Sequence, residues 1–274
     1  MEPQSFSLSF PHPLPIFQLR FSSEPIILDG IEMEVDVLAI GAHPDDIELS
    51  CGGTIARLVK DGHRVALADI TQGELGTRGN KQIRAKEAAI AAKILGVVTR
   101  RNLKVPDGNI ELNNANLKKV IALIRELRPR ILIIPHSVER HPDHVHAHRL
   151  CKEAWYYAGL RKIETSLKGV KQRSHRPDNF FEFMQWYEFT PSFIVDISST
   201  FEAKMKAIRA HASQFYDPKS KDPETLLSRP EFLERIRTDS EYYGKKIGVK
   251  YGEPFYSWTP LGVKTIFDFV LTKG

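Results

Sequence analysis

Cysteine is scarce in this chain of 274 residues, in which only Cys51 and Cys151 occur. Two cysteines cannot form the disulfide framework of a small secreted domain, and a reducing compartment fits this composition. Long apolar runs are lacking as well, and no stretch approaches the ~20 residues that span a bilayer. We therefore expect a cytoplasmic protein with no membrane partner.

Signatures of phosphate and nucleic-acid binding are also weak. The segment CGGT (51–54) lacks both the GxGxxG spacing and the lysine of a P-loop, so close approach of a helix to a sheet explains its glycines better. The net charge is +5, but the basic residues are scattered and form no pattern with aromatic residues. This favours a solvated surface, or a site for small anions, over a nucleic-acid partner.

The first 32 residues differ from the rest of the chain. Residues 1–34 contain one cation and five anions, and the first 15 residues contain four prolines without the basic region of a signal peptide. The first convincing strand follows Met33. We expect residues 1–32 to be a loosely ordered N-terminal extension, or the product of a misplaced start, and residues 33–274 to form a single domain.

Strand and helix patterns alternate along the next part of the chain. Apolar runs rich in β-branched residues predict strands at 35–40, 64–70, near 101–105 and at 130–135. Amphipathic spacing predicts helices ending near Gly62 and covering 81–96, 115–127 and about 143–158. Such alternation predicts an α/β fold whose Rossmann-like, mostly parallel sheet carries helices on both faces.

Beyond residue 175 the pattern changes. FFEFMQWYEF (180–189) and SFIVDIS (192–198) predict later strands, and two helices follow near 200–211 and 229–246. The tail GVKTIFDFVL (262–271) is expected to form a last strand or a packed ending. No internal repeat or break in composition indicates a second domain.

Residue types that bind metals follow two of the predicted strands. AHPDD, with His43, Asp45 and Asp46, comes directly after 35–40. HSVERHPDHVHAH follows 130–135 and contains His136, His141, Asp143, His144, His146 and His148. Ligands of open α/β sheets bind beyond the carboxyl ends of the strands, so the two clusters share one rim if the strands are neighbours.

Imidazole and carboxylate groups together suit zinc, and three protein ligands with an open position are typical of a catalytic site. His43 and Asp46 stand three residues apart at a helix start and can point the same way. Asp45 then faces another direction, where it can accept a proton from water. The ordinary interpretation of such an aspartate pair is a helix start stabilised by the helix dipole.

The second cluster is ambiguous by itself. His144 and His148 have the spacing of a helical metal pair, whereas His141 and His144 flank a Pro-Asp step. For His146 and His148 we expect an exposed or core-satisfied histidine. The loop TQGELGTRG (71–79) is expected on the same rim, as a substrate wall or as a plain surface loop.

AHPDD (42–46) and HPDH (141–144) together resemble the hallmark motifs of the LmbE-like (PIG-L) zinc-dependent N-acetylglucosamine deacetylases. Segments such as TQGELGTRG, PDGNI, IRAHASQF and GEPFYSWTPLGV extend the resemblance from about Val35 to Leu261. They narrow it to the deacetylases of bacillithiol biosynthesis, which act on N-acetylglucosaminyl malate.

The resemblance implies a role for each matching residue. Zn²⁺, or another divalent ion such as Fe²⁺, is expected on His43, Asp46 and His144. Asp45 corresponds to the general base, His141 to the residue that stabilises or protonates the intermediate, and Asp143 to one that orients a histidine. Arg84 and Arg140 are expected to bind the substrate, and the family suggests a homo-oligomer such as a hexamer.

Hydrolysis of the acetamide of N-acetylglucosaminyl malate is therefore the expected function. One alternative is another N-acetyl sugar or thiol conjugate, such as a mycothiol precursor or a chitooligosaccharide. An alternative of a different class is a non-enzymatic nucleotide-binding α/β module, against which the missing phosphate fingerprint counts.

Overall fold

The structure is a computed structural model that describes residues 33–271. Its central sheet has seven strands in the order β3-β2-β1-β4-β7-β9-β8. These strands are β1 (Val37–Gly41), β2 (Val65–Asp69), β3 (Thr99–Asn102), β4 (Ile131–Pro135), β7 (Asn179–Phe183), β8 (Phe193–Asp196) and β9 (Gly252–Tyr256). Neighbours from β3 to β7 are parallel, whereas β9 is antiparallel to β7 and β8. The predicted mostly parallel, Rossmann-like sheet is confirmed.

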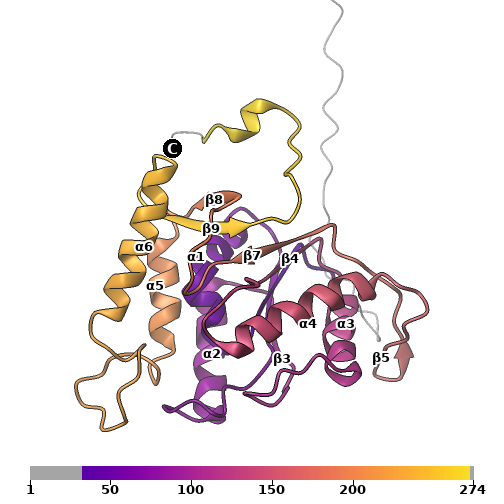
Figure 1. Cartoon of the computed structure of the whole chain (residues 1–274), viewed down its shortest axis with the longest axis horizontal. Coiled ribbons are helices and arrows are strands. Elements are labelled where there is room, and N and C mark those ends of the chain that lie inside the picture. Colours follow the sequence, from indigo (N-terminus) through magenta and orange to yellow (C-terminus); the bar gives the residue numbers. More distant parts are fainter. Residues whose placement is uncertain (1–32, 272–274) are drawn as a thin grey trace, which may run out of the picture. The chain divides into compact units, whose positions relative to one another are not determined.

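Helices cover both faces of this sheet (Figure 1). They are α1 (Asp46–Lys60), α2 (Lys81–Leu95), α3 (Asn114–Leu127), α4 (Pro142–Ala158), α5 (Phe201–Ala210) and α6 (Phe232–Lys246). Successive side chains of β1 point to opposite faces of the sheet. Leu38 and Ile40 pack with α3 and α4 on one face, and Val37 and Ala39 pack with α1, α2 and α5 on the other. The predicted helices on both faces are thus confirmed.

A third apolar cluster joins α5, α6 and the loop between them. Phe201 stacks on Tyr251 with ring centroids 3.8 Å apart, and Phe232 at the start of α6 lies 6.1 Å from Phe215. This cluster anchors the segment 226–236 beside the carboxyl edge of the sheet, next to the candidate site.

Three features differ from the sequence-based expectations. The sequence predicts no strand at 252–256 and no hairpin, yet β9 lies inside the sheet and β5 (Ser166–Leu167) pairs with β6 (Val170–Lys171). The tail is neither a strand nor packed, because it forms a 3₁₀ turn, η1 (Ile266–Phe269), whose Ile266 is 78% exposed.

Residues 1–32 lie outside the described residues, so the expected extension and the single domain over 33–274 stay predictions. In the part of the chain that the structure covers, no helix has the length and apolar character needed to cross a membrane.

One glycine of the CGGT pair, Gly53, lets α1 approach its neighbours closely. A Cβ on Gly53 would lie 2.7 Å from the side chain of Ile197, whereas a Cβ on Gly52 would lie 3.4 Å from Lys204, an ordinary contact. α1 is kinked just before this point, at Cys51. The second half of α1 therefore depends on a glycine at position 53.

We predict that Gly53→Ala lowers the free energy of unfolding by about 1–3 kcal/mol, as expected when a packed core is overfilled. Urea unfolding followed by circular dichroism measures this change. Gly52→Ala is the matched control and should cause no loss, since alanine is up to about 1 kcal/mol better than glycine in a helix. Equal stability of the two variants would contradict the close approach.

Candidate active site

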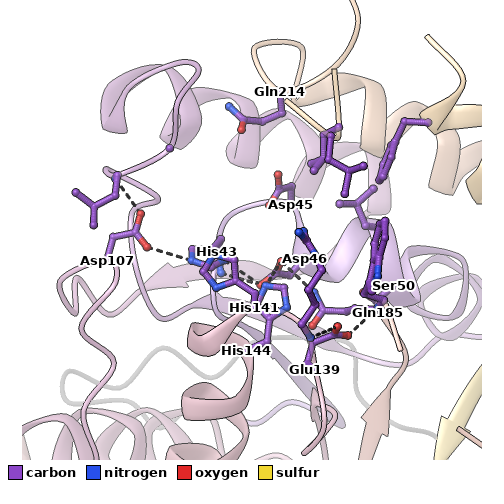
Figure 2. Close-up of a pocket in the computed structure, with 18 of the residues that line it drawn as sticks. His43, Asp45, Asp46, Ser50, Asp107, Glu139, His141, His144, Gln185 and Gln214 are labelled. Atoms are coloured by element: carbon purple, nitrogen blue, oxygen red, sulfur yellow. Dashed lines mark hydrogen bonds and ion pairs between the residues drawn. The ribbon is translucent and has the colours of Figure 1, made fainter. Parts of the chain in front are cut away.

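β1 and β4 are neighbouring parallel strands, so the loops that follow them leave the sheet at the same edge. Their register pairs Val37 with Ile131 and Ala39 with Ile133. Strands β2 and β3 lie on one side of β1, and β4 and β7 lie on the other, which makes this the switch point where doubly wound sheets bind ligands. The predicted clusters do meet here (Figure 2).

The three predicted metal ligands, His43, Asp46 and His144, offer donor atoms that all lie within 4.8 Å of one another. Nε2 of His144 lies 3.2 Å from Oδ1 of Asp46, and Nδ1 of His43 lies 3.7 Å from Oδ2 of the same carboxylate. Two imidazoles and one carboxylate form a typical donor set for catalytic zinc, and they also suit Fe²⁺. The residues therefore fit a divalent ion.

The electrostatics of this group also favour a cation. Burial alone would raise the pKa of Asp46, but His144 and His43 outweigh it and hold that pKa well below its usual value. Burial alone would lower the pKa of His43, but hydrogen bonds with Asp107, Asp143 and Asp46 raise it well above its usual value. Carboxylates that attract a proton to an imidazole attract a metal cation as well.

The ring of His43 is held from its other side. Its Nε2 lies 3.0 Å from Oδ1 of Asp107 and 3.3 Å from Oδ2 of Asp143. Carboxylates commonly hold the second nitrogen of a metal-ligating histidine and fix the orientation of its ring. Asp143 thus contacts a histidine as expected, and Asp107 is a second such contact that the sequence interpretation missed.

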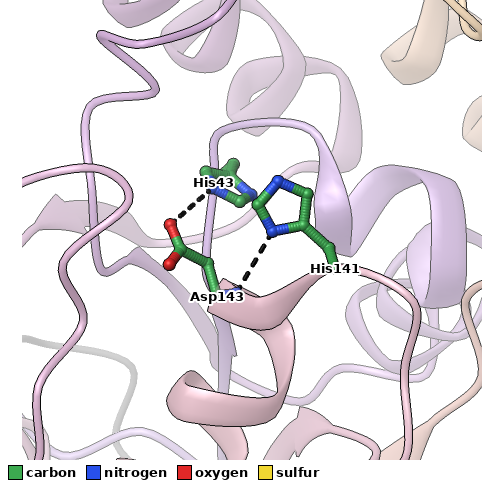
Figure 3. A group of neighbouring side chains, drawn as sticks. All are labelled: His43, His141 and Asp143. Atoms are coloured by element: carbon green, nitrogen blue, oxygen red, sulfur yellow. Dashed lines mark hydrogen bonds and ion pairs between the residues drawn. The ribbon is translucent and has the colours of Figure 1, made fainter.

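His43, His141 and Asp143 form a second group of suitable donors (Figure 3). Here, however, the Asp143 carboxylate also accepts the N–H of Gly108 at 2.8 Å. The N–H of Asp143 donates to Nδ1 of His141 at 3.2 Å. One nitrogen of His141 is thus already used as an acceptor, whereas both imidazoles of the first group place a ring nitrogen within 3.7 Å of the Asp46 carboxylate. His43, Asp46 and His144 are therefore the better candidate for the ion.

Asp45 is the N-cap residue of α1 and has a strained backbone, with φ at 129°. Such strain in a non-glycine residue is common at functional sites. Its side chain is buried, and burial raises the pKa of Asp45 while Arg84 opposes the rise. Nη2 of Arg84 lies 3.1 Å from Oδ1 of Asp45 and donates to the carbonyl of Pro44 at 2.6 Å.

These contacts bear on the predicted role of Arg84 as a substrate-binding residue. Its guanidinium also donates to the carbonyl of Gly73 at 3.3 Å, and its side chain is buried. Arg84 lines the cavity, but its observed contacts hold Asp45 in place. Direct binding of substrate by Arg84 stays a prediction.

His141 precedes α4 and lies against both histidine ligands. Its ring centroid is 4.9 Å from that of His43 and 5.0 Å from that of His144. Burial, followed by the charges of these two histidines, lowers the pKa of His141. Since its Nδ1 accepts the N–H of Asp143, the neutral ring carries its proton on Nε2, the remaining nitrogen.

Arg140 lies at the rim of the same cavity. Its guanidinium packs over the ring of Trp186, with Cζ 4.8 Å from the ring centroid. Glu139 orders this rim, since its carboxylate accepts the N–H of Arg140 at 2.6 Å and that of Trp186 at 2.7 Å. The geometry leaves Arg140 beside the cavity, and its predicted contact with substrate is untested.

The other histidines of the second cluster lie outside the candidate metal groups of the described chain. His148 is buried and its Nδ1 donates to the carbonyl of Pro135 at 3.1 Å, whereas His146 is exposed. The expectation of a core-satisfied or exposed histidine is confirmed for both. His136 contacts Glu182 at 2.6 Å.

Gln185 is a further site residue that the sequence interpretation missed. It follows β7, the strand beside β4, and its Nε2 donates to Oδ1 of Asp46 at 3.1 Å. Asp107 lies beyond the end of β3 in the PDGN turn. A search for polar residues beyond every strand end would have found both, although neither belongs to a local motif.

The three candidate ligands line one cavity of about 350 Å³ together with Asp45, Arg84, Asp107, Arg140, His141 and Gln185. Leu75 and Gly76, from the loop 71–79, line its edge, so this loop lies on the rim as expected. The volume is within the ~300–1,000 Å³ of typical small-molecule sites. Fold, donor set and cavity together define an α/β protein with a candidate hydrolytic metal centre.

Comparison with known proteins identifies the family. The PIG-L family, described as GlcNAc-PI de-N-acetylase, matches residues 38–155. Diacetylchitobiose deacetylase of Thermococcus kodakarensis is 34% identical over 229 residues, which cover 79% of this chain and 80% of that protein. The chain belongs to the PIG-L (LmbE-like) family of N-acetylglucosamine deacetylases, and the family expectation is confirmed.

Two further comparisons show the fold and the range of substrates among relatives. The conserved protein TT1542 from Thermus thermophilus has a TM-score of 0.74 and 36% identity, covering 84% of this chain and 97% of that one. A probable N-acetyl-α-D-glucosaminyl L-malate deacetylase 2 of Bacillus cereus is 29% identical, covering 66% of this chain and 84% of that protein. The similarity therefore does not single out a malate substrate.

We predict that His144→Ala weakens binding of Zn²⁺ more than about 100-fold, because loss of a direct ligand exceeds the ~10–100-fold cost of losing an outer partner. Competition with a chromophoric chelator measures the affinity. His146→Ala, an exposed histidine on the same helix, is the control and should bind Zn²⁺ as the wild type does. Unchanged affinity in His144→Ala would remove His144 from the site.

Proposed function

We propose that the chain hydrolyses the acetamide of an N-acetylglucosamine conjugate, using a divalent ion held by His43, Asp46 and His144. The convergence of their donor atoms within 4.8 Å, in one cavity with Asp45, is the observation that carries this proposal. Membership of a deacetylase family supports the reaction type.

Asp45 is the proposed general base. A divalent ion at this site would supply Lewis acidity, which polarises a carbonyl and lowers the pKa of water. Asp45 takes the proton of the attacking water, and its contact with Arg84 fixes the carboxylate in the orientation needed. It then returns this proton to the nitrogen that leaves as an amine, so acetic acid and the amine form without a further proton donor, and the acid then ionises to acetate.

His141 is the proposed stabiliser of the developing negative charge. The N–H of Asp143 donates to Nδ1 of His141, which leaves the ring proton on Nε2. This Nε2–H donates to the oxygen of the former carbonyl. A neutral imidazole fulfils this role without first gaining a proton. Asp143 acts through its contacts with His43 and His141, both of which it orients.

The identity of the conjugate is a finer question. A malate group presents two carboxylates, which arginines bind well. Arg84 is engaged with Asp45 and with two backbone carbonyls, so Arg140 is the arginine at the cavity through which a malate conjugate would be recognised. The proposal therefore covers N-acetylglucosamine conjugates as a class.

We predict that Asp45→Asn retains Zn²⁺ but lowers kcat by about 10²–10⁴-fold, the usual contribution of a general base. Asparagine keeps the shape of the side chain and cannot take a proton. Metal content and acetate release on the same preparation give the two readouts. Turnover close to that of the wild type would show that another group is the base.

The malate conjugate is tested through Arg140. If it is a substrate, Arg140→Ala should raise KM for N-acetylglucosaminyl malate at least about tenfold more than KM for N-acetylglucosamine, because a charge-assisted hydrogen bond is worth roughly 1.5–3 kcal/mol. Steady-state kinetics on both substrates gives the comparison. Equal changes in KM would exclude Arg140 from carboxylate binding.

A further inference from the structure

The cavity divides into a polar floor and an apolar wall. Every titratable side chain that lines it comes from outside the segment 226–236. That segment contributes Leu226, Leu227, Phe232 and Ile236 to the cavity, and these four residues are called here the leucine wall.

Charged residues are present in the same segment, but none of their side chains lines the cavity. Arg235 approaches it only indirectly, by packing over the ring of Trp186. Arg229 pairs with Glu224 at 3.2 Å, and Arg235 contacts Asp239 at 3.5 Å. The segment therefore contains charged side chains, but the side chains that it places in the cavity are apolar.

The leucine wall is held in place before any ligand arrives. Leu226 and Leu227 occupy the centre of a turn closed by reciprocal hydrogen bonds, in which the N–H of Thr225 donates to Oγ of Ser228 at 2.8 Å and that Oγ donates to the carbonyl of Thr225 at 3.1 Å. Behind the turn, both leucines pack against the third core cluster. A turn fixed in this way presents apolar surface to the cavity at little cost in entropy when a ligand binds.

We propose that the leucine wall binds an apolar substituent of the substrate, so that the preferred N-acylglucosamine conjugate carries a hydrocarbon group beside the sugar. This inference rests on the proposed function, since it concerns the same cavity. The hydrocarbon is either part of the group on the anomeric oxygen or an N-acyl chain longer than acetyl. Either one removes apolar surface of the wall from water, and a free acid there would meet no cation from the wall.

The experiment uses the full chain loaded with Zn²⁺, three synthetic probes, and N-acetylglucosaminyl malate assayed alongside them for comparison. The methyl glycoside of N-acetylglucosamine is the reference, its hexyl glycoside extends the anomeric side, and the methyl glycoside of N-hexanoylglucosamine extends the acyl side. Release of the free amine gives kcat/KM for each probe. Each methylene taken out of water contributes about fourfold.

We expect the wild type to prefer one of the two extended probes over the reference by at least about tenfold, and the preferred probe identifies the side on which the hydrocarbon lies. Leu227→Asn, of similar shape but polar, should reduce this ratio at least about fivefold. A variant that had only lost folded protein would lose both probes alike and leave the ratio unchanged. Leu233→Asn is the matched control, because Leu233 packs on the same cluster without lining the cavity.

Three outcomes would overturn the proposal: equal kcat/KM for all three probes in the wild type, a ratio unaffected by Leu227→Asn, or a preference for N-acetylglucosaminyl malate over both extended probes. Absence of hydrolysis of every probe would instead contradict the proposed deacetylase function itself.

Discussion

Contacts from three strand ends converge on the carboxylate of Asp46, and the candidate site depends on this convergence. Oδ2 accepts the N–H of His43 at 2.9 Å, in the loop after β1. Oδ1 contacts His144, from the loop after β4, and Gln185, from the loop after β7. Because parallel pairing places these three ends side by side, the carboxylate is fixed before any ion binds, which preorganises the site.

Buried charges behind the site keep this arrangement rigid. Glu253 accepts the N–H groups of Gly53 and Thr54 at 2.9 and 2.6 Å, and it thereby caps the second half of α1 just beyond the kink at Cys51. Lys204 neutralises that carboxylate at 2.6 Å. Removing one partner of such a buried pair costs far more than the pair contributes. The Glu253 carboxylate thus stabilises the kink, and the kink sets the direction of the first turn of α1, which carries Asp46.

Part of this site could be predicted from the sequence, because its residues stand in short local motifs. Residues that join the site only through long-range contacts could not be predicted. The Asp45–Asp46 pair and the later histidines stand in short motifs, so their grouping followed once two strands were taken as neighbours. Gln185 lies 139 residues from Asp46 and has no motif of its own. β9 was missed for a similar reason, because its glutamate and proline are unusual in a central strand. The burial of the Glu253 carboxylate is explained by its contacts with Lys204 and with the N–H groups of Gly53 and Thr54.

The central claim is that two imidazoles and one carboxylate share a divalent ion, and X-ray absorption at the zinc edge tests it most directly. The account predicts a shell of nitrogen and oxygen neighbours at about 2.0–2.1 Å, with the outer-shell signal of two imidazole rings and no sulfur. Both cysteines are buried, and neither Cys51 nor Cys151 belongs to the donor groups found in the described residues. A shell containing sulfur, or one lacking the imidazole signal, would contradict the account.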